Sequence, residues 1–234
     1  MHATSEQINH MLALADAAGL HEACGVVLDS GRVYPCRNRS LLPAEYFELD
    51  PVDYAAAEQL GRVAGIWHSH PHGSAEPSWV DRAMCERTRL PWHIVSPGGG
   101  DYRYLEPSGW QAPLLGRPYC YGVFDCWELV RDWYRQERGM VLSRPPAAGE
   151  AGWSERGCNV IHDAATAMGF ARHDGEPQAG DLAVFQMQSA VPNHLAVWLG
   201  DGRILHHLRD RPSETHVYGG YWARCMTGFW RYQG

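Results

Sequence analysis

The sequence has no apolar run approaching the roughly 18 to 20 residues that a membrane-spanning helix needs, and no basic segment followed by an apolar core at its start. We therefore expect no membrane span and no secretory signal, and we expect the chain to be made and folded in the cytoplasm. Basic residues are also few, since 20 Lys and Arg stand against 27 Asp and Glu, for a net charge of -7. Sequence-independent binding of nucleic acid needs clustered basic residues, so we expect no nucleic-acid partner.

Cys-x-x-Cys pairs are missing too, because the seven cysteines are odd in number and widely scattered. This spacing fits neither a disulfide framework nor a thiolate zinc site, and we expect most of the cysteines to be small buried hydrophobes. What the chain does have is 13 His and 10 Trp among 234 residues, of which 45% are apolar. That length and composition suit one large globular domain or two small ones.

Periodicity and turn residues predict two domains of unlike fold in a mixed α/β, or α+β, chain. The first half is predicted to form helices over 5–18, 52–62 and 78–87 and strands over 24–28, 33–37, 64–67, 92–96 and 102–105. Residues 106–118 contain three prolines and two glycines, so we place the boundary there and divide the chain into 1–108 and 109–234. The second half is predicted to form helices over 125–138 and 159–168, a loop over 144–149, and strands over 181–187, 194–199, 203–207 and 228–232.

A metal site is predicted where the strand over 64–67 ends. His68 and His70 project from the same face, and Asp81, eleven residues later, can return to them from the following helix. Three such ligands with an open fourth position are typical of catalytic Zn²⁺. Glu22, at the head of the first strand, is the candidate base for a zinc-bound water, and the hydroxyl of Ser78, one helical turn before Asp81, can donate to a substrate oxyanion.

These residues together resemble the motif of the JAMM metallopeptidases: Glu22, then His68-x-His70, then Ser78 and Asp81. The resemblance covers residues 1–105 and implies a domain with a central sheet like that of cytidine deaminases. It also implies zinc-dependent hydrolysis of peptide or isopeptide bonds. A deubiquitinase-like substrate does not follow, because kinship of fold does not carry the substrate over.

A thiol site is predicted at Cys126, which opens the helix over 125–138. The positive end of the helix dipole is expected to lower the pKa of this thiol. His194 begins an apolar strand, and His206 lies twelve residues further on, after a Gly200-Asp201-Gly202 turn. A hairpin there places His206 beside His194, so that Cys126 gains a base and the base gains an orienting residue.

These residues resemble the NlpC-type cysteine peptidases, a papain-like family that cuts the peptide stems of peptidoglycan, commonly between D-glutamate and diaminopimelate. The resemblance implies that Cys126 is the nucleophile, His194 the base and His206 the orienting residue. Tyr119 corresponds to the family's tyrosine near the oxyanion. The stretch from Tyr119 to Cys126 is shorter than in the family, so Tyr121 is an alternative for that place.

The remaining histidines and tryptophans have less informative surroundings. His72 could reach the metal site, and His207 and His216 are plausible neighbours of the thiol site, but we expect all three to be surface residues. His93 is expected to be packed or hydrogen-bonded within its strand. The two tryptophans of the helix over 125–138 are expected in the core, at positions 127 and 133.

A JAMM-like domain followed by an NlpC-like domain resembles the family of tail assembly proteins of lambda-like phages. The resemblance covers nearly the whole chain and implies phage tail-tip proteins and peptidoglycan peptides as partners. It places the protein in the host cytoplasm during tail assembly, or at the tail tip of the virion. A different class of function stays open: a non-catalytic assembly factor or scaffold with vestigial peptidase sites.

Overall fold

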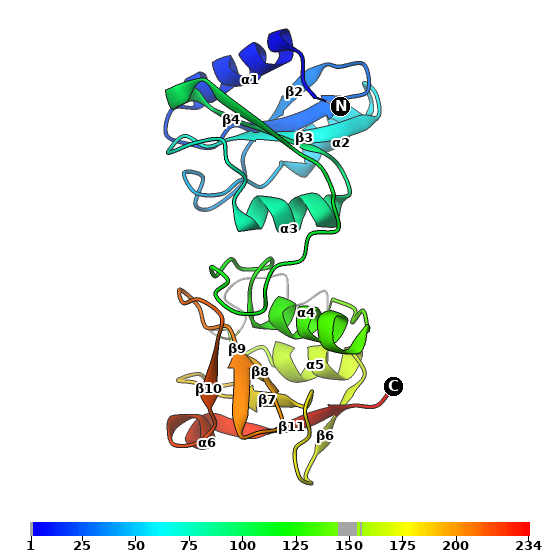
Figure 1. Ribbon diagram of the computed structural model, residues 1–234, viewed down its shortest axis with the longest axis vertical. Coiled ribbons are helices and arrows are strands. Elements are labelled where there is room, and N and C mark those ends of the chain that lie inside the picture. The colour runs from blue at the N-terminus through cyan, green and yellow to red at the C-terminus, as the bar shows by residue number, and fades with distance from the viewer. Residues whose placement is uncertain (1, 145–153, 155) are drawn as a thin grey trace. The chain divides into compact units, whose positions relative to one another are not determined.

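The computed structural model describes residues 2–144, 154 and 156–234 (Figure 1). The chain divides into two compact units, Met1–Gln111 and Ala112–Gly234. Within the described residues, no helix is long and apolar enough to cross a membrane. Of the loop predicted over 144–149, residues 145–149 lie outside the described part of the chain.

The first unit is a five-stranded sheet covered by helices on both faces. Its strand order is β2-β1-β3-β4-β5, and only the pair β3 and β4 is parallel. The strands are β1 (Cys24–Leu28), β2 (Val33–Cys36), β3 (Val63–Ser69), β4 (Trp92–Ser96) and β5 (Asp101–Leu105). Helix α1 (Ser5–Ala18) lies on one face, while α2 (Pro51–Glu58) and α3 (Trp79–Thr88) lie on the other (Figure 1), and a short 3-10 helix, η1 (Pro97–Gly99), joins β4 to β5.

Alternation of side chains along the strands explains this layering. Val27 packs under α1 with Met11, whereas its neighbour Val26 packs on the opposite face with Ala57 of α2. Every residue of β1 is buried, as expected for a strand covered on both sides. Ile66 of β3 faces α3, so His68, two residues later, points to that face as well.

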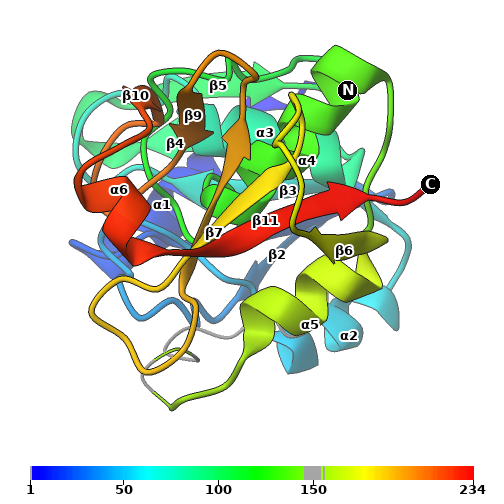
Figure 2. The same cartoon turned by 90° about the horizontal axis from the view of Figure 1, so that it is seen from below.

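The second unit is a six-stranded antiparallel sheet with the order β10-β9-β8-β7-β11-β6. Its strands are β6 (Phe170–His173), β7 (Leu182–Phe185), β8 (His194–Trp198), β9 (Arg203–His206), β10 (Glu214–Val217) and β11 (Met226–Tyr232). Helices α4 (Cys126–Arg138) and α5 (Val160–Ala167) form the main core with one face of the sheet. The short helix α6 (Tyr221–Cys225) leads directly into β11 (Figure 2) and places Trp222 on the other face.

The predicted organisation is confirmed: two domains of mixed helix and sheet. Most boundaries differ by a residue or two, and the larger differences are that α2 ends at Glu58, β3 continues to Ser69, β7 covers only Leu182–Phe185 and β11 begins at Met226. His68 therefore lies inside the strand, where hydrogen bonds to neighbouring strands fix its backbone. Three short elements, β6, β10 and α6, were not predicted, because each has only four or five residues and is formed by its tertiary partners.

Candidate active sites

Three side chains in the first unit meet as the sequence predicted. Nε2 of His68 lies 3.2 Å from Oδ1 of Asp81, and Nε2 of His70 lies 3.3 Å from Oδ2 of the same carboxylate. The two Nε2 atoms are 3.1 Å apart. His68 and Asp81 are buried and His70 is half-buried, so the cluster opens to solvent on the His70 side.

Neighbouring groups hold both imidazoles with Nε2 turned toward the cluster. Nδ1 of His70 lies 2.9 Å from the carbonyl oxygen of Ser74, which accepts a hydrogen bond and leaves a lone pair on Nε2. The ring of His68 stacks on Phe47 at a centroid distance of 4.6 Å, and Trp92 contacts it edge-on at 5.4 Å. The ring contacts thus hold His68 with its Nε2 at the cluster, while its Nδ1 has no hydrogen-bond partner among the described residues.

The donor set fits zinc. With metal–ligand bonds of about 2.0 to 2.1 Å, the donors of a tetrahedral site are about 3.3 Å apart. The two imidazole nitrogens are 3.1 Å apart, and each lies 3.2 or 3.3 Å from one of the two oxygens of Asp81, distances close to that value. Two imidazoles and one carboxylate are also a ligand set typical of a zinc site that keeps one position open.

Ser78 and Glu22 both lie beside this cluster. Ser78 is the N-cap of α3: its Oγ accepts from the backbone N–H of Asp81 at 3.1 Å, and its own N–H donates to Oδ2 of Asp81 at 2.7 Å. This capping box fixes the metal-facing carboxylate. The backbone N–H of Ser69 donates to the carbonyl oxygen of Ala23 at 2.9 Å, and the N–H of Ala23 donates to the hydroxyl oxygen of Ser69 at 2.9 Å. These two bonds hold the buried Glu22, which precedes Ala23, next to the end of β3.

Burial and neighbouring positive charge have opposite effects on the pKa values of the Glu22 and Asp81 carboxyl groups. Burial raises the pKa of Glu22, and His68 and His70 only partly offset that effect. Burial alone also raises the pKa of Asp81, but the facing His68, together with hydrogen bonds from Ser78 and from the two imidazoles in their protonated forms, holds it well below its usual range. The pKa values of the two carboxyl groups of one cluster are thus shifted in opposite directions, that of Glu22 upward and that of Asp81 downward.

In the second unit, Cys126 is the first residue of α4. Asp125 caps the helix by accepting from the N–H of Glu128 at 2.9 Å, and its other oxygen accepts from the N–H of Gly122 at 2.8 Å. The half-buried Cys126 lies in a pocket of about 350 Å³. This pocket is also lined by His194 and by both tyrosines proposed for the oxyanion side, Tyr119 and Tyr121.

His206 does not line the pocket and lies behind His194. Its ring meets that of His194 edge-on, with centroids 5.4 Å apart and planes at 85°. In the hairpin of β8 and β9, His206 pairs with Ala196, so the two histidines are diagonal neighbours on one face of the sheet. Nε2 of His206 lies 2.8 Å from Nδ1 of His216, on β10.

The expected lowering of the thiol pKa is wrong. Burial raises the pKa of Cys126 to about 12, with a further increase from Asp125, and the N–H groups of Leu195 and Trp127 only partly oppose this. Burial likewise lowers the pKa of His194 well below its usual value. At neutral pH the pair is a thiol and a neutral imidazole, because desolvation outweighs the helix dipole at this position.

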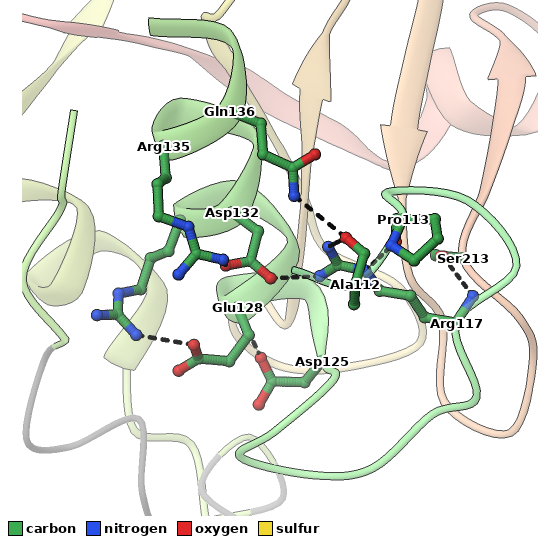
Figure 3. Close-up of polar contacts among 10 residues, drawn as sticks. Ala112, Pro113, Arg117, Asp125, Glu128, Asp132, Arg135, Gln136 and Ser213 are labelled. Carbon is green, nitrogen blue, oxygen red and sulfur yellow. Dashed lines mark hydrogen bonds and ion pairs between the residues drawn. The ribbon is translucent and has the colours of Figure 1, made fainter. Parts of the chain in front are cut away.

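Hydrogen bonds and an ion pair made by Arg117, here called the clasp, fix the segment that leads into Cys126 (Figure 3). The fully buried Arg117 donates to Asp132 of α4 at 2.6 Å and to the carbonyls of Pro113 and Ala112 at 2.5 and 2.9 Å. Its backbone N–H donates to the hydroxyl of Ser213 at 2.9 Å. The clasp therefore ties the segment before Tyr119 to α4 and to the start of β10.

The other histidines and the two tryptophans of α4 lie in part where the sequence predicted. His72 is exposed as expected, and His93 is buried with Nδ1 3.0 Å from the hydroxyl of Tyr102. The two tryptophans of α4 are in the core, at positions 127 and 133. His207 is not a surface residue: it is buried, lines the pocket and meets Tyr119 edge-on at 5.4 Å. The role of His216 beside His206 was also missed, because only the pairing of β9 with β10 brings them together.

Comparison with known proteins identifies the two domains. Residues 4–107 match the family described as prokaryotic homologs of the JAB domain, and residues 116–231 match the NlpC/P60 family. The chain is thus a two-domain protein with a JAB-like and an NlpC/P60 domain. It is 42% identical to tail tip assembly protein K of Escherichia phage N15 over 97% of this chain and 94% of that protein. It is 32% identical to tail tip assembly protein K of Escherichia phage lambda over 79% of this chain and 89% of that one. The chain belongs to the family of tail tip assembly protein K.

Among solved structures, an NlpC/P60 family protein from Bacillus cereus ATCC 10987 is 14% identical to the chain, with a TM-score of 0.36. That match covers 94% of this chain and 66% of the other. A solution structure of protein DSY2949 from Desulfitobacterium hafniense is 30% identical, covers 44% of this chain and 79% of the other, and has a TM-score of 0.37.

Proposed function

We propose that this phage tail tip assembly protein is a peptidase with two separate active sites. The first unit hydrolyses a peptide or isopeptide bond with zinc, and the second cuts the stem peptides of peptidoglycan with Cys126. The proposal rests above all on one observation: Cys126 and His194 line a single pocket at the N-terminus of α4.

In the first unit, His68, His70 and Asp81 would hold the zinc ion. Bound zinc supplies a polarised water and a Lewis acid for the substrate carbonyl. Glu22 takes the proton of the attacking water and delivers it to the leaving amine, a role that suits a buried carboxylate beside the ligands. Ser78 Oγ already accepts from the N–H of Asp81, so its own O–H is free to donate to the oxyanion.

In the second unit, His194 takes the proton from the thiol of Cys126 as Sγ attacks the carbonyl carbon of the scissile bond. The imidazolium then returns that proton to the leaving amine, which departs and leaves a thioester on Cys126. A water molecule, deprotonated by His194, hydrolyses the thioester and restores the thiol. The hydroxyl of Tyr119, or of Tyr121 in its place, donates to the oxyanion, and His206 orients His194 from behind.

The substrate class and the partners follow from kinship. The named relatives are tail tip assembly proteins, so we propose phage tail-tip proteins as partners and the host cytoplasm during assembly, or the tail tip of the virion, as the location. Stem peptides of peptidoglycan are the proposed substrate of the second unit, because its residues match an NlpC/P60 family. The target of the zinc unit is then a tail component or the same wall.

One observation favours the second candidate, a non-catalytic assembly factor with vestigial sites. The resting thiol of Cys126 has a raised pKa, whereas a preformed thiolate would be the stronger sign of an active nucleophile. The same protonation state suits an enzyme in which His194 removes the proton only during attack. The two functions therefore differ in whether His194 activates Cys126.

Two measurements on the purified protein test the proposal without knowledge of the substrate. The full chain is expected to bind one equivalent of zinc, and Asp81→Asn to bind much less. Alkylation of Cys126, followed by mass spectrometry of its peptide, is expected to be assisted by His194 and therefore to slow in His194→Ala. A protein without stoichiometric zinc, and with Cys126 alkylated no faster in the presence of His194, would be an assembly factor only.

A further inference from the structure

Behind His194 the ring contacts continue through two more residues to the edge of the sheet. The fully buried His206 lies 2.8 Å from Nδ1 of His216 through its Nε2. Nε2 of His216 lies 3.6 Å from Oε2 of Glu214, and both of these side chains are partly exposed, 40% and 37%. A carboxylate on the surface is therefore connected to the pocket by three imidazoles in sequence.

The Glu214 carboxylate favours a proton on one particular nitrogen of His216. An ionised Glu214 can only accept, so it favours a proton on the facing Nε2 of His216. Nδ1 of His216 then has a lone pair and accepts from Nε2–H of His206 across the 2.8 Å contact. His206 in turn has its lone pair on Nδ1.

Two buried ring nitrogens lack hydrogen-bond partners among the described residues: Nδ1 of His206 and Nε2 of His194. They belong to two rings that meet edge-on with their centroids 5.4 Å apart, so each ring is a possible partner for the other. A lone pair on Nδ1 of His206 matches a proton on Nε2 of His194. That tautomer of His194 keeps its lone pair on Nδ1.

We propose that Glu214 and His216 are positioning residues which, through His206, hold His194 in the tautomer with a free Nδ1. This inference rests on the proposed cysteine peptidase function. In the first step the proton moves from Sγ of Cys126 to Nδ1 of His194, giving a thiolate and an imidazolium. The imidazolium then donates through Nε2 to His206, and the series ends at the negative charge of Glu214, which stabilises the ion pair as it forms.

The tautomer can be observed directly. In ¹⁵N-histidine NMR of the full chain, a protonated and an unprotonated ring nitrogen have well-separated shifts. The wild type is expected to show His194 protonated at Nε2 only. His216→Phe keeps a ring but offers no acceptor, so His194 should become a mixture of tautomers. His216→Asn places an amide oxygen near the former Nδ1 and should restore the wild-type spectrum.

A second measurement reports the consequence at the thiol. Loss of a hydrogen bond to a charged network shifts a tautomer balance by about tenfold or more. Alkylation of Cys126 at pH 7 should slow about tenfold in His216→Phe and recover in His216→Asn. Thr215→Val, on the opposite face of β10, controls for damage to the strand and should change neither measurement.

Three results would overturn the inference: a wild-type His194 protonated at Nδ1, a His194 spectrum unchanged in His216→Phe, or failure of His216→Asn to restore it. Binding of a metal ion by His206, Glu214 and His216, whose ligand atoms lie within 4.8 Å of one another, would also overturn it. Such binding would appear as shifts of the His206 and His216 signals at a second equivalent of zinc. The tautomer is measured without substrate, so a protein that shows it and yet cleaves no muropeptide would refute the proposed function and leave this arrangement standing.

Discussion

Replacing Arg117 by methionine is expected to destabilise the second unit strongly, although residue 117 is not part of either proposed active site. The guanidinium is fully buried and donates to the Asp132 carboxylate and to two carbonyls (Figure 3). Methionine fills a similar volume but donates nothing. The substitution removes one of the two partners of the Asp132 charge and the Arg117 donor of the Pro113 carbonyl, while the carbonyl of Ala112 still accepts from Gln136 at 3.1 Å.

The size of the expected destabilisation follows from the burial of the ion pair between Arg117 and Asp132. Removing one member of a buried ion pair costs about 3 to 5 kcal/mol. Asp132 keeps a second partner, Arg135 at 2.5 Å, so we expect the lower end, about 3 kcal/mol. Arg135→Met is the matched control: it removes the other partner of the same carboxylate, but its side chain is 42% exposed, and such pairs contribute about 0.2 to 1 kcal/mol.

Hydrogen exchange of the α4 amides is the suitable assay, because two units in one chain do not share a single free energy of unfolding. In Arg117→Met the most protected amides should exchange roughly 150-fold faster, which corresponds to about 3 kcal/mol. In Arg135→Met they should change less than about fivefold. Equal effects of the two substitutions would refute the claim that burial of the Arg117 partner governs the stability of α4.

Three further predictions concern residues near the two sites. Burial lowers the pKa of His206 from 6.5 to about 3, so the unfolded chain binds a proton that the folded one does not. The second unit should therefore lose up to about 4 kcal/mol as the pH falls through that window, measured by urea unfolding at pH 7 and pH 4 and reduced in His206→Asn. A Cβ at Gly25 would lie 2.6 Å from Nε1 of Trp67 and against the Tyr34 carbonyl, so Gly25→Ala should cost about 1 to 3 kcal/mol in thermal unfolding of the first unit. Ser78→Ala removes the cap of α3 and should cost about 1 kcal/mol and weaken zinc binding in a competition titration, whereas Ser78→Thr should retain both.

Much of the fold could be predicted because its longer elements carry strong local signals. The helix α1 has a capping box at Thr4 and a glycine at its end, and the buried strand β1 is apolar throughout. The end of β3 could not be predicted from propensity, since His68 and Ser69 are polar and are held in the strand by pairing with β1 and β4. The short β10 has no apolar pattern of its own and exists through its pairing with β9.

For the two sites, the spacing of residues in the sequence predicted which side chains meet, but it did not predict their pKa values. His68, His70 and Asp81 converge because a strand end and a capped helix leave little freedom in their placement. The pKa of Cys126 depends instead on how much water reaches the thiol, which the position of a helix start does not reveal. His207 and His216 were missed for a related reason: their partners come from other parts of the chain, Tyr119 and His206.

The central claim, that the second unit cuts peptidoglycan stem peptides through Cys126 independently of the zinc site, is tested by one crossed cleavage measurement. Defined muropeptides are incubated with the wild type, with Cys126→Ala and with Asp81→Asn, and the products are followed by mass spectrometry. Cleavage by the wild type and Asp81→Asn, but not by Cys126→Ala, is the predicted result. Cleavage that survives in Cys126→Ala, or its absence from a wild-type protein that binds zinc and is correctly folded, would contradict it.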